Sequence, residues 1–199
     1  MKISVRFFLF LFVALITTST FAADTADKAK MEEMMKSFKE YSTPGPQHKT
    51  LAGMVGHWTY TSKMWMSAAA APQESKGTAN FKMIMGGRYL QQNVKGKAMM
   101  NMPFDGMALT GYNNLKKNFE TLWIDSMGTG MTQGTSTFDE KTSTFSENGT
   151  YTCPQESDKV REYRAEWKLI DKNNMIYSMF GPGDDGKEYK HMEMTYKRK

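Results

Sequence analysis

The sequence is poor in the residues that build metal centres and covalent cross-links. Cys153 is the single cysteine among 199 residues, so no disulfide bond can form within one chain. Its place between Thr152 and Pro154, in a polar stretch, predicts a loop. The three histidines show no His-x-His or His-x3-His spacing, so a zinc or iron site would have to be assembled from distant elements. We therefore expect no metal site and no cofactor.

Patterns typical of catalysis are missing as well. Neither a Ser-His-Asp order nor a pair of acids at a catalytic spacing appears in the sequence. His191 alternates with Tyr189 and Glu193, opposite to Met192 and Met194, which predicts a solvated imidazole. The residues themselves thus favour a protein without enzymatic activity.

The chain has only a small excess of charge of one sign. Twenty-six Lys and Arg residues stand against 21 Asp and Glu residues, a net charge of +5 that is spread evenly along the chain. Such a small excess predicts neither a nucleic-acid partner nor an anionic membrane partner.

Long apolar runs are limited to the first residues. Phe7–Ile16 is an unbroken apolar run of ten residues, about half of the ~20 that a membrane-spanning helix needs. Basic residues precede it, and small residues follow as far as Ala22 and Ala23, which is typical of a cleavable signal peptide. We expect a signal peptide over residues 1–22 with cleavage near Ala22/Ala23, export to the periplasm or secretion, and no stable membrane insertion of the mature chain.

Residues 23–45 are expected to form a Met-rich amphipathic helix and a Pro/Gly linker. Its apolar side chains recur at helical spacing: Met31, Met34, Met35 and Phe38. Thr43–Pro46 ends the helix, because proline lacks the backbone N–H and glycine loosens the backbone. A second short helix is predicted over Gln47–Val55, at the start of the main domain at residues 46–199.

After Gly56 the hydrophobic period changes from that of a helix to that of a strand. Gly, Asn and Asp turns then separate about ten alternating segments, at 58–66, 81–85, 89–95, 104–112, 118–126, 129–138, 142–150, 160–170, 174–180 and 187–198. No helix-length segment lies between any two of them, which excludes a parallel βαβ sheet. We predict an all-β fold, an up-and-down antiparallel barrel of about ten strands that leaves no free edge. A two-sheet sandwich is the alternative, and it usually needs longer crossover connections.

Several short motifs in combination resemble one known family. They lie at residues 48–51, 55–58, 74–78, 85–90, 102–106, 111–113, 121–126, 185–188 and 196–198. Together they are similar to the bacterial domain-of-unknown-function family 1579, grouped with the lipocalin-like (calycin) superfamily, over about Pro46–Arg198. The resemblance implies a lipocalin-like barrel, in agreement with the strand pattern, and brings no established reaction.

The resemblance also implies a structural signature at Gly56-His57-Trp58. Calycins carry a Gly-x-Trp on the first strand, whose indole plugs the barrel floor under a basic residue of the last strand. Arg198 stands at the matching position here. A guanidinium over an indole is a cation–π contact worth about 0.5–2 kcal/mol.

The interior of such a barrel is the candidate ligand site. The predicted lining residues are Trp58, Tyr60, Met64, Phe81, Met83, Arg88, Trp123, Asp125 and Trp167. Asp125 is expected either as an inward acid at the barrel mouth or as a cap of the following turn. Arg88 either holds a ligand carboxylate or lies at the rim. The first hypothesis is therefore an exported barrel that binds a small, largely apolar ligand.

Methionine is abundant, with 19 residues that often recur in pairs such as Met64/Met66 and Met192/Met194. Paired thioethers on one strand face are explained by core packing, by an adaptable wall for apolar ligands, or by a soft metal such as Cu(I) or Ag(I). The second hypothesis is therefore a metal-handling protein or an enzyme that uses the barrel cavity. The third is a structural or interaction protein with a filled barrel. Nothing in the sequence indicates an oligomeric state.

Overall fold

The computed structural model describes residues 16–98, 101–152, 159–183 and 185–199. Most of the predicted signal peptide, Cys153 and the pair Met99-Met100 lie outside these residues. The chain divides into two units, residues 1–43 and residues 44–199. No helix in the described part of the chain is both long and apolar enough to cross a membrane.

The first unit contains helix α1 (Ile16–Ser42), which begins before the segment of residues 23–45 in which the sequence predicts a helix. The methionines of its apolar stripe and Phe38 are all more than half exposed. The expected stripe is therefore present and lies on the exposed surface of the helix.

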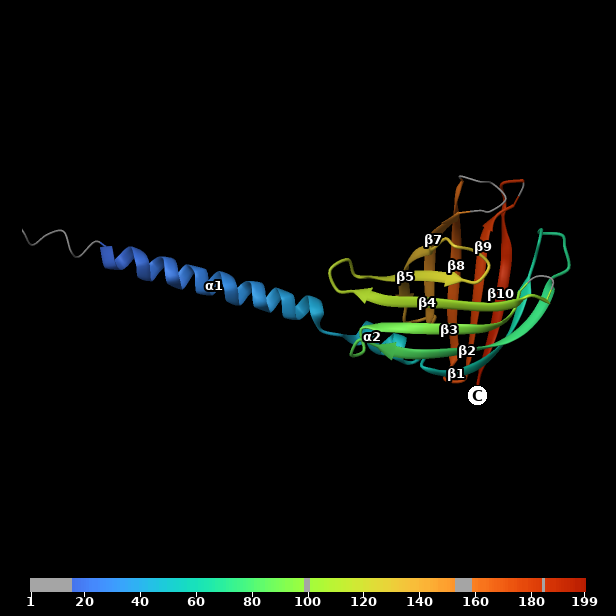
Figure 1. The fold of residues 1–199 in the computed structure, drawn as a ribbon, viewed down its shortest axis with the longest axis horizontal. Coiled ribbons are helices and arrows are strands. Elements are labelled where there is room, and N and C mark those ends of the chain that lie inside the picture. Colours follow the sequence, from blue (N-terminus) through green and yellow to red (C-terminus); the bar gives the residue numbers. More distant parts are fainter. Residues whose placement is uncertain (1–15, 99–100, 153–158, 184) are drawn as a thin grey trace, which may run out of the picture. The chain divides into compact units, whose positions relative to one another are not determined.

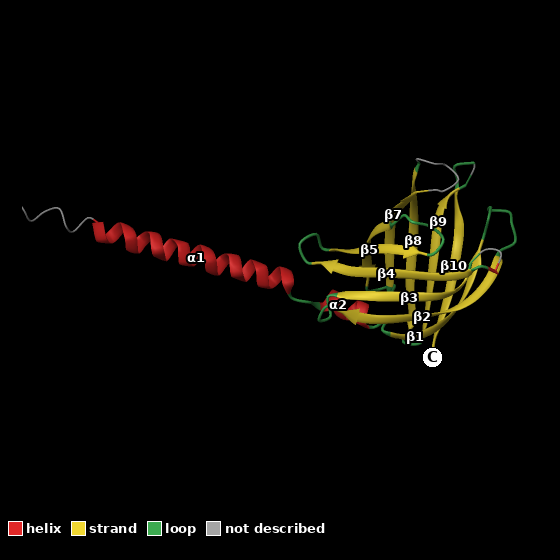
Figure 2. Ribbon diagram, in the orientation of Figure 1, coloured by secondary structure: helices red, strands yellow, loops and turns green. Residues whose placement is uncertain are grey.

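The second unit is a short helix followed by ten strands (Figure 1). The elements are α2 (Pro46–Ala52), β1 (Gly56–Met64), β2 (Gln73–Ile84), β3 (Tyr89–Lys97), β4 (Pro103–Asn113), β5 (Asn118–Asp125), β6 (Thr132–Asp139), β7 (Thr144–Thr152), β8 (Val160–Asp171), β9 (Asn174–Pro182) and β10 (Glu188–Arg198). Each strand pairs antiparallel with its sequence neighbours, and β1 pairs with β10, so the sheet closes (Figure 2). The predicted up-and-down barrel of about ten strands is confirmed.

Strand β2 is longer than its hydrophobic pattern indicates. It begins at Gln73, eight residues before the predicted Phe81. Residues 73–78 carry polar or small side chains on both faces, so they give no apolar alternation, yet their backbone pairs in register with β1 as far as Met64. Backbone pairing with a well-patterned neighbour, rather than burial, determines this half of the strand.

One end of the barrel, here called the closed end, is covered by α2. Leu51 and Met54 of this region are 2% and 5% exposed, and the indole Nε1 of Trp58 donates a hydrogen bond of 3.0 Å to the Met54 carbonyl. The edge of the His48 ring packs against Tyr112, with ring centroids 5.9 Å apart. The other end, called the open end, carries the β1–β2, β3–β4 and β5–β6 connections.

Arg198 seals the closed end from outside. Its guanidinium lies 4.1 Å from the centre of the Trp58 indole, as the resemblance implies. It also donates hydrogen bonds to the carbonyls of Gly53 at 3.0 Å, of Lys172 at 2.6 Å and of Val55. The last strand is thereby tied to the loop after α2 and to the β8–β9 turn.

Candidate functional site

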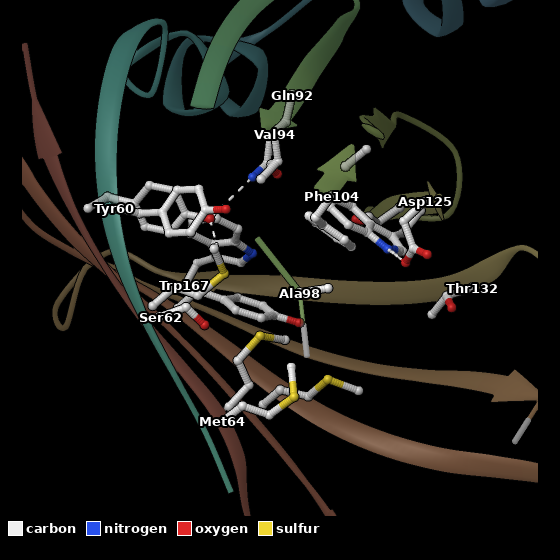
Figure 3. Close-up of a pocket in the computed structure, with 18 of the residues that line it drawn as sticks. Tyr60, Ser62, Met64, Gln92, Val94, Ala98, Phe104, Asp125, Thr132 and Trp167 are labelled. Carbon is white, nitrogen blue, oxygen red and sulfur yellow. Dashed lines mark hydrogen bonds between the residues drawn. The ribbon is translucent and has the colours of Figure 1, made fainter. Parts of the chain in front are cut away.

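The barrel encloses a cavity of about 800 Å³. It extends from Leu51 and Met54 at the closed end to Gln73 and Asn101 at the open end. In Figure 3, Tyr60, Trp167 and Met64 lie on one side of this space, across from Phe104 and Asp125. Its volume falls within the ~300–1,000 Å³ of usual small-molecule sites. The barrel is therefore not filled by its own side chains.

Two groups of aromatic side chains line or underlie the cavity. The first comprises Trp58, Tyr60, Phe81, Trp167, Tyr177 and Tyr196. The second comprises Tyr112, Phe119, Phe138 and Phe145, with neighbouring ring centroids 4.5–5.0 Å apart. The interplanar angles are mostly steep, as aromatic quadrupoles prefer. These contacts fix the apolar walls in position.

The structure brings six of the nine predicted lining residues to the cavity wall. They are Tyr60, Met64, Phe81, Trp123, Asp125 and Trp167. Trp58 is 2% exposed and forms the floor, and Met83 packs against the core from the closed end. Arg88 is exposed in the β2–β3 turn, where its guanidinium donates to the Met85 carbonyl at 3.1 Å. Arg88 therefore lies at the rim of the barrel, as one of its two predictions had it, and this rim belongs to the closed end.

Asp125 combines its two predicted roles. Its carboxylate accepts a hydrogen bond of 2.7 Å from the indole Nε1 of Trp123, within the cavity wall. It also accepts one of 2.8 Å from the backbone N–H of Met127, which caps the turn after β5. The residue is an inward acid near the open end, oriented by both neighbours.

Methionines form part of the wall near the open end. Met64 of β1 pairs with Met192 of β10, which pairs with Met179 of β9, so three thioethers lie in one row facing the cavity. Methionine adapts its shape to different apolar neighbours. Among the described residues, no group of three or more His, Cys, Asp and Glu side chains is placed to hold a metal ion.

His191 differs from its prediction as a solvated residue. The pairing of β10 with β9 shifts between Lys190 and Met192, so His191 is the extra residue of a bulge. Its ring lies 4.1 Å from that of Tyr189, and its Nε2 atom is shielded from solvent. Simple alternation fails here because the bulge changes the face to which this position points.

The sequence reasoning missed the most buried acid of the cavity, Glu147 on β7. Its side chain is 6% exposed, and its Oε1 atom accepts a hydrogen bond of 2.6 Å from the Tyr163 hydroxyl of β8. A second hydrogen bond comes from Thr121, whose hydroxyl lies 3.2 Å from that of Thr110. Residues of four strands, β4, β5, β7 and β8, thus form one polar network that spans β6 at Gly134.

Two glycines make room for this pair. A Cβ atom at Gly134 of β6 would lie 2.7 Å from the Glu147 carboxylate, and one at Gly149 of β7 would lie 2.5 Å from the Tyr163 ring. Both distances are shorter than a van der Waals contact allows. Two signals in the sequence could have identified Glu147. Phe145 and Glu147 alternate on the inward face of β7, and glycines at inward positions of neighbouring strands indicate that a large side chain lies beside them.

Burial changes the acid–base properties of the pair. Removal of water from around the Glu147 carboxylate raises its pKa above the usual 4.5, against the opposing effect of the hydrogen bonds from Tyr163 and Thr121. Burial, together with the negative charge of Glu147, raises the pKa of Tyr163 as well. The tyrosine therefore remains a hydrogen-bond donor to the carboxylate across the physiological range.

A dependence of stability on pH follows from the raised pKa of Glu147. Between the unfolded and the folded pKa, the folded protein binds more protons than the unfolded chain, so the free energy of unfolding falls as pH rises. Below the pKa that Glu147 has in the unfolded chain, the carboxyl group is protonated in both states, and this loss of stability is absent. We expect the stability of Glu147→Gln, relative to the native protein, to increase as the pH rises above the pKa of 4.5 that is usual for an unfolded glutamate. Urea denaturation of both proteins at each pH measures it, and a constant or decreasing difference would contradict the assignment.

The closed ten-strand barrel, capped at one end by a helix and hollow inside, defines a lipocalin-like barrel protein. Residues 43–198 match the family described as "Protein of unknown function (DUF1579)", and the chain belongs to this family. The comparison with curated proteins found no match.

Two solved structures show the same fold. The crystal structure of Rv2717c from M. tuberculosis is 13% identical with a TM-score of 0.59, covering 79% of this chain and 99% of that chain. The structure of the S-type phycobiliprotein lyase CPES from Guillardia theta is 12% identical with a TM-score of 0.55, covering 80% of this chain and 95% of that chain. At these identities the similarity concerns the fold.

Proposed function

We propose that this protein binds a small, largely apolar molecule inside its barrel. The observation that carries the proposal is the cavity of about 800 Å³, lined mainly by aromatic, methionine and aliphatic side chains. A filled barrel of a purely structural protein would have no such space. The similarity in fold to a protein named a phycobiliprotein lyase is in keeping with a barrel that accommodates a ligand.

The character of the wall supports the same ligand class. Met64, Met179 and Met192 provide flexible apolar contacts near the open end, and the aromatic groups provide rigid ones deeper inside. The buried polar residues of the wall are few, namely Ser62, Gln92, Ser136 and Glu147. An apolar wall with a few fixed polar groups is the usual composition of a small-molecule site.

The proposal includes export of the protein. A basic start, the apolar run Phe7–Ile16 and the small residues before Ala23 support removal of residues 1–22 by a signal peptidase. The barrel would then operate in the periplasm or outside the cell. Because the single cysteine allows no disulfide within the chain, the fold does not depend on the oxidising conditions of these compartments.

Binding of a neutral apolar fluorophore tests the proposed function. We expect N-phenylnaphthylamine to bind the purified full chain with a dissociation constant in the micromolar range or lower, because the cavity removes the dye from water. Saturable fluorescence enhancement with a stoichiometry of one measures it. Native mass spectrometry of protein purified from its own host reports any molecule retained. Absence of saturable dye binding to the folded protein would refute the proposal.

A further inference from the structure

We propose that the ligand of this cavity is an apolar molecule carrying a basic amine, and that the amine is bound by Glu147. The inference rests on the proposed function and concerns the polar end of the same ligand. Its basis is the position of Glu147, its hydrogen bonds and the charges that surround it.

Glu147 lies inside the barrel and still borders the cavity. On β7 it pairs with Ser136 of β6 and Ala165 of β8, which are both buried and 5% and 0% exposed. Phe145, two residues nearer the closed end, belongs to the second aromatic group. A ligand that reaches Glu147 therefore has its apolar part against the aromatic walls and its polar end at the carboxylate.

The carboxylate has capacity left for another donor. When the carboxyl group is ionised, as it is beside a protonated amine, its two oxygens offer about four acceptor sites. Tyr163 and Thr121 supply two hydrogen bonds, and both come from the barrel wall. The remaining lone pairs are available to a group that enters the cavity. The Tyr163 hydroxyl donates its one proton to Glu147, so it can accept a hydrogen bond from an entering group but cannot donate one to it.

No basic side chain in the described part of the chain contributes to the pKa of Glu147. The basic residues that border the cavity, Lys76 and Lys97, are exposed at its open end. Arg161 of β8 is not among the cavity-lining residues. The other inward carboxylate, Asp125, adds a second negative group nearer the mouth.

This charge distribution discriminates between ligands. A buried carboxylate without a nearby cation is costly, and a protonated amine supplies both the missing charge and hydrogen-bond donors. A ligand carboxylate would instead meet two acids and no buried cation among the described lining residues. An alcohol of the same length can donate a hydrogen bond but brings no charge. The expected order of affinity is amine, then alcohol, then carboxylic acid.

A matched series of ligands tests this order. Dodecylamine, dodecanol and dodecanoic acid share one apolar chain and are compared by displacement of N-phenylnaphthylamine at neutral pH, below the concentrations at which they aggregate. For the native protein we expect the amine to bind at least about tenfold more tightly than the acid, which corresponds to ~1.4 kcal/mol. In Glu147→Gln we expect the ratio of amine to alcohol affinity to fall by at least about tenfold.

A control acid lies on the outer face of the barrel. The Glu166 carboxylate of β8 forms an ion pair with the Arg164 guanidinium, with an N–O distance of 2.5 Å. Glu166→Gln therefore removes a carboxylate that lies outside the cavity. This variant should keep the native order of affinities. Thermal melting of both variants shows whether they fold, and the comparison in the native protein needs no variant at all.

The outcomes separate the inference from the function on which it rests. Equal or tighter binding of the acid than of the amine overturns the inference, as does an amine-to-alcohol ratio unchanged in folded Glu147→Gln. In either case dye binding would still support an apolar cavity. Failure of the native protein to bind the dye and all three amphiphiles would instead refute the proposed function.

Discussion

Replacing Trp58 with alanine should lower the free energy of unfolding by about 3–5 kcal/mol, the usual cost of emptying a buried tryptophan site. The side chain is 2% exposed and packs edge-on against Phe81, with ring centroids 6.4 Å apart. Its loss would also remove the hydrogen bond to Met54 and leave the Arg198 guanidinium without its aromatic partner. Urea denaturation followed by circular dichroism measures the change.

Trp65 provides the comparison within the same chain. It follows β1 at the open end and is only partly buried, and its backbone N–H donates to the His191 carbonyl, a bond that alanine keeps. Trp65→Ala should therefore cost clearly less stability than Trp58→Ala. Equal losses for the two variants would show that Trp58 has no special place in the floor of the barrel.

Replacing Ser62 and Ser136 together with tryptophan should block the cavity and weaken dye binding at least about tenfold, or ~1.4 kcal/mol. Ser62 on β1 and Ser136 on β6 both line the cavity and are 7% and 5% exposed. Their strands lie five positions apart in either direction around the ten-strand order, so they face each other across the barrel. Tryptophan at both positions fills the space between. Fluorescence titration with N-phenylnaphthylamine measures the effect.

The matched control places the same residues on the outside. Thr59 of β1 and Thr135 of β6 are exposed and point away from the cavity, so Thr59→Trp with Thr135→Trp should bind the dye as the native protein does. Overpacking costs about 1–3 kcal/mol, so melting curves accompany both variants, and leucine replaces tryptophan at the inner positions if folding is lost. Unchanged binding in a folded inner variant would place the dye elsewhere.

Much of the fold is readable from the sequence because each strand has its own alternation. Trp58, Tyr60 and Met64 share the face that the structure turns inward, and short turns leave only antiparallel neighbours possible. The pattern fails where local sequence no longer decides the structure. Residues 73–78 become strand through pairing with β1, and His191 changes face because of a bulge.

The candidate site was harder to predict for a related reason. Alternation identifies an inward face but does not rank the residues on it, so Glu147 looked like any polar residue of a Thr-rich strand. Its importance depends on partners 16 and 26 positions away in the chain, Tyr163 and Thr121, and on two glycines that make space for them. Arg88 shows the reverse case, since a turn at the closed end keeps it out of the cavity.

The pairing of β1 with β10 has a consequence for how the chain folds. Trp58 on the first strand lies opposite Arg198 on the last strand, so the barrel closes only after the last strand has been synthesised. Contacts between such distant residues carry a large loop-closure cost, and proteins dominated by non-local pairing fold slowly. Until the last strand arrives, the polypeptide has two unpaired strand edges and an exposed apolar face. During that interval the growing chain is open to chaperones and to aggregation, and both end when Arg198 reaches its place over the indole.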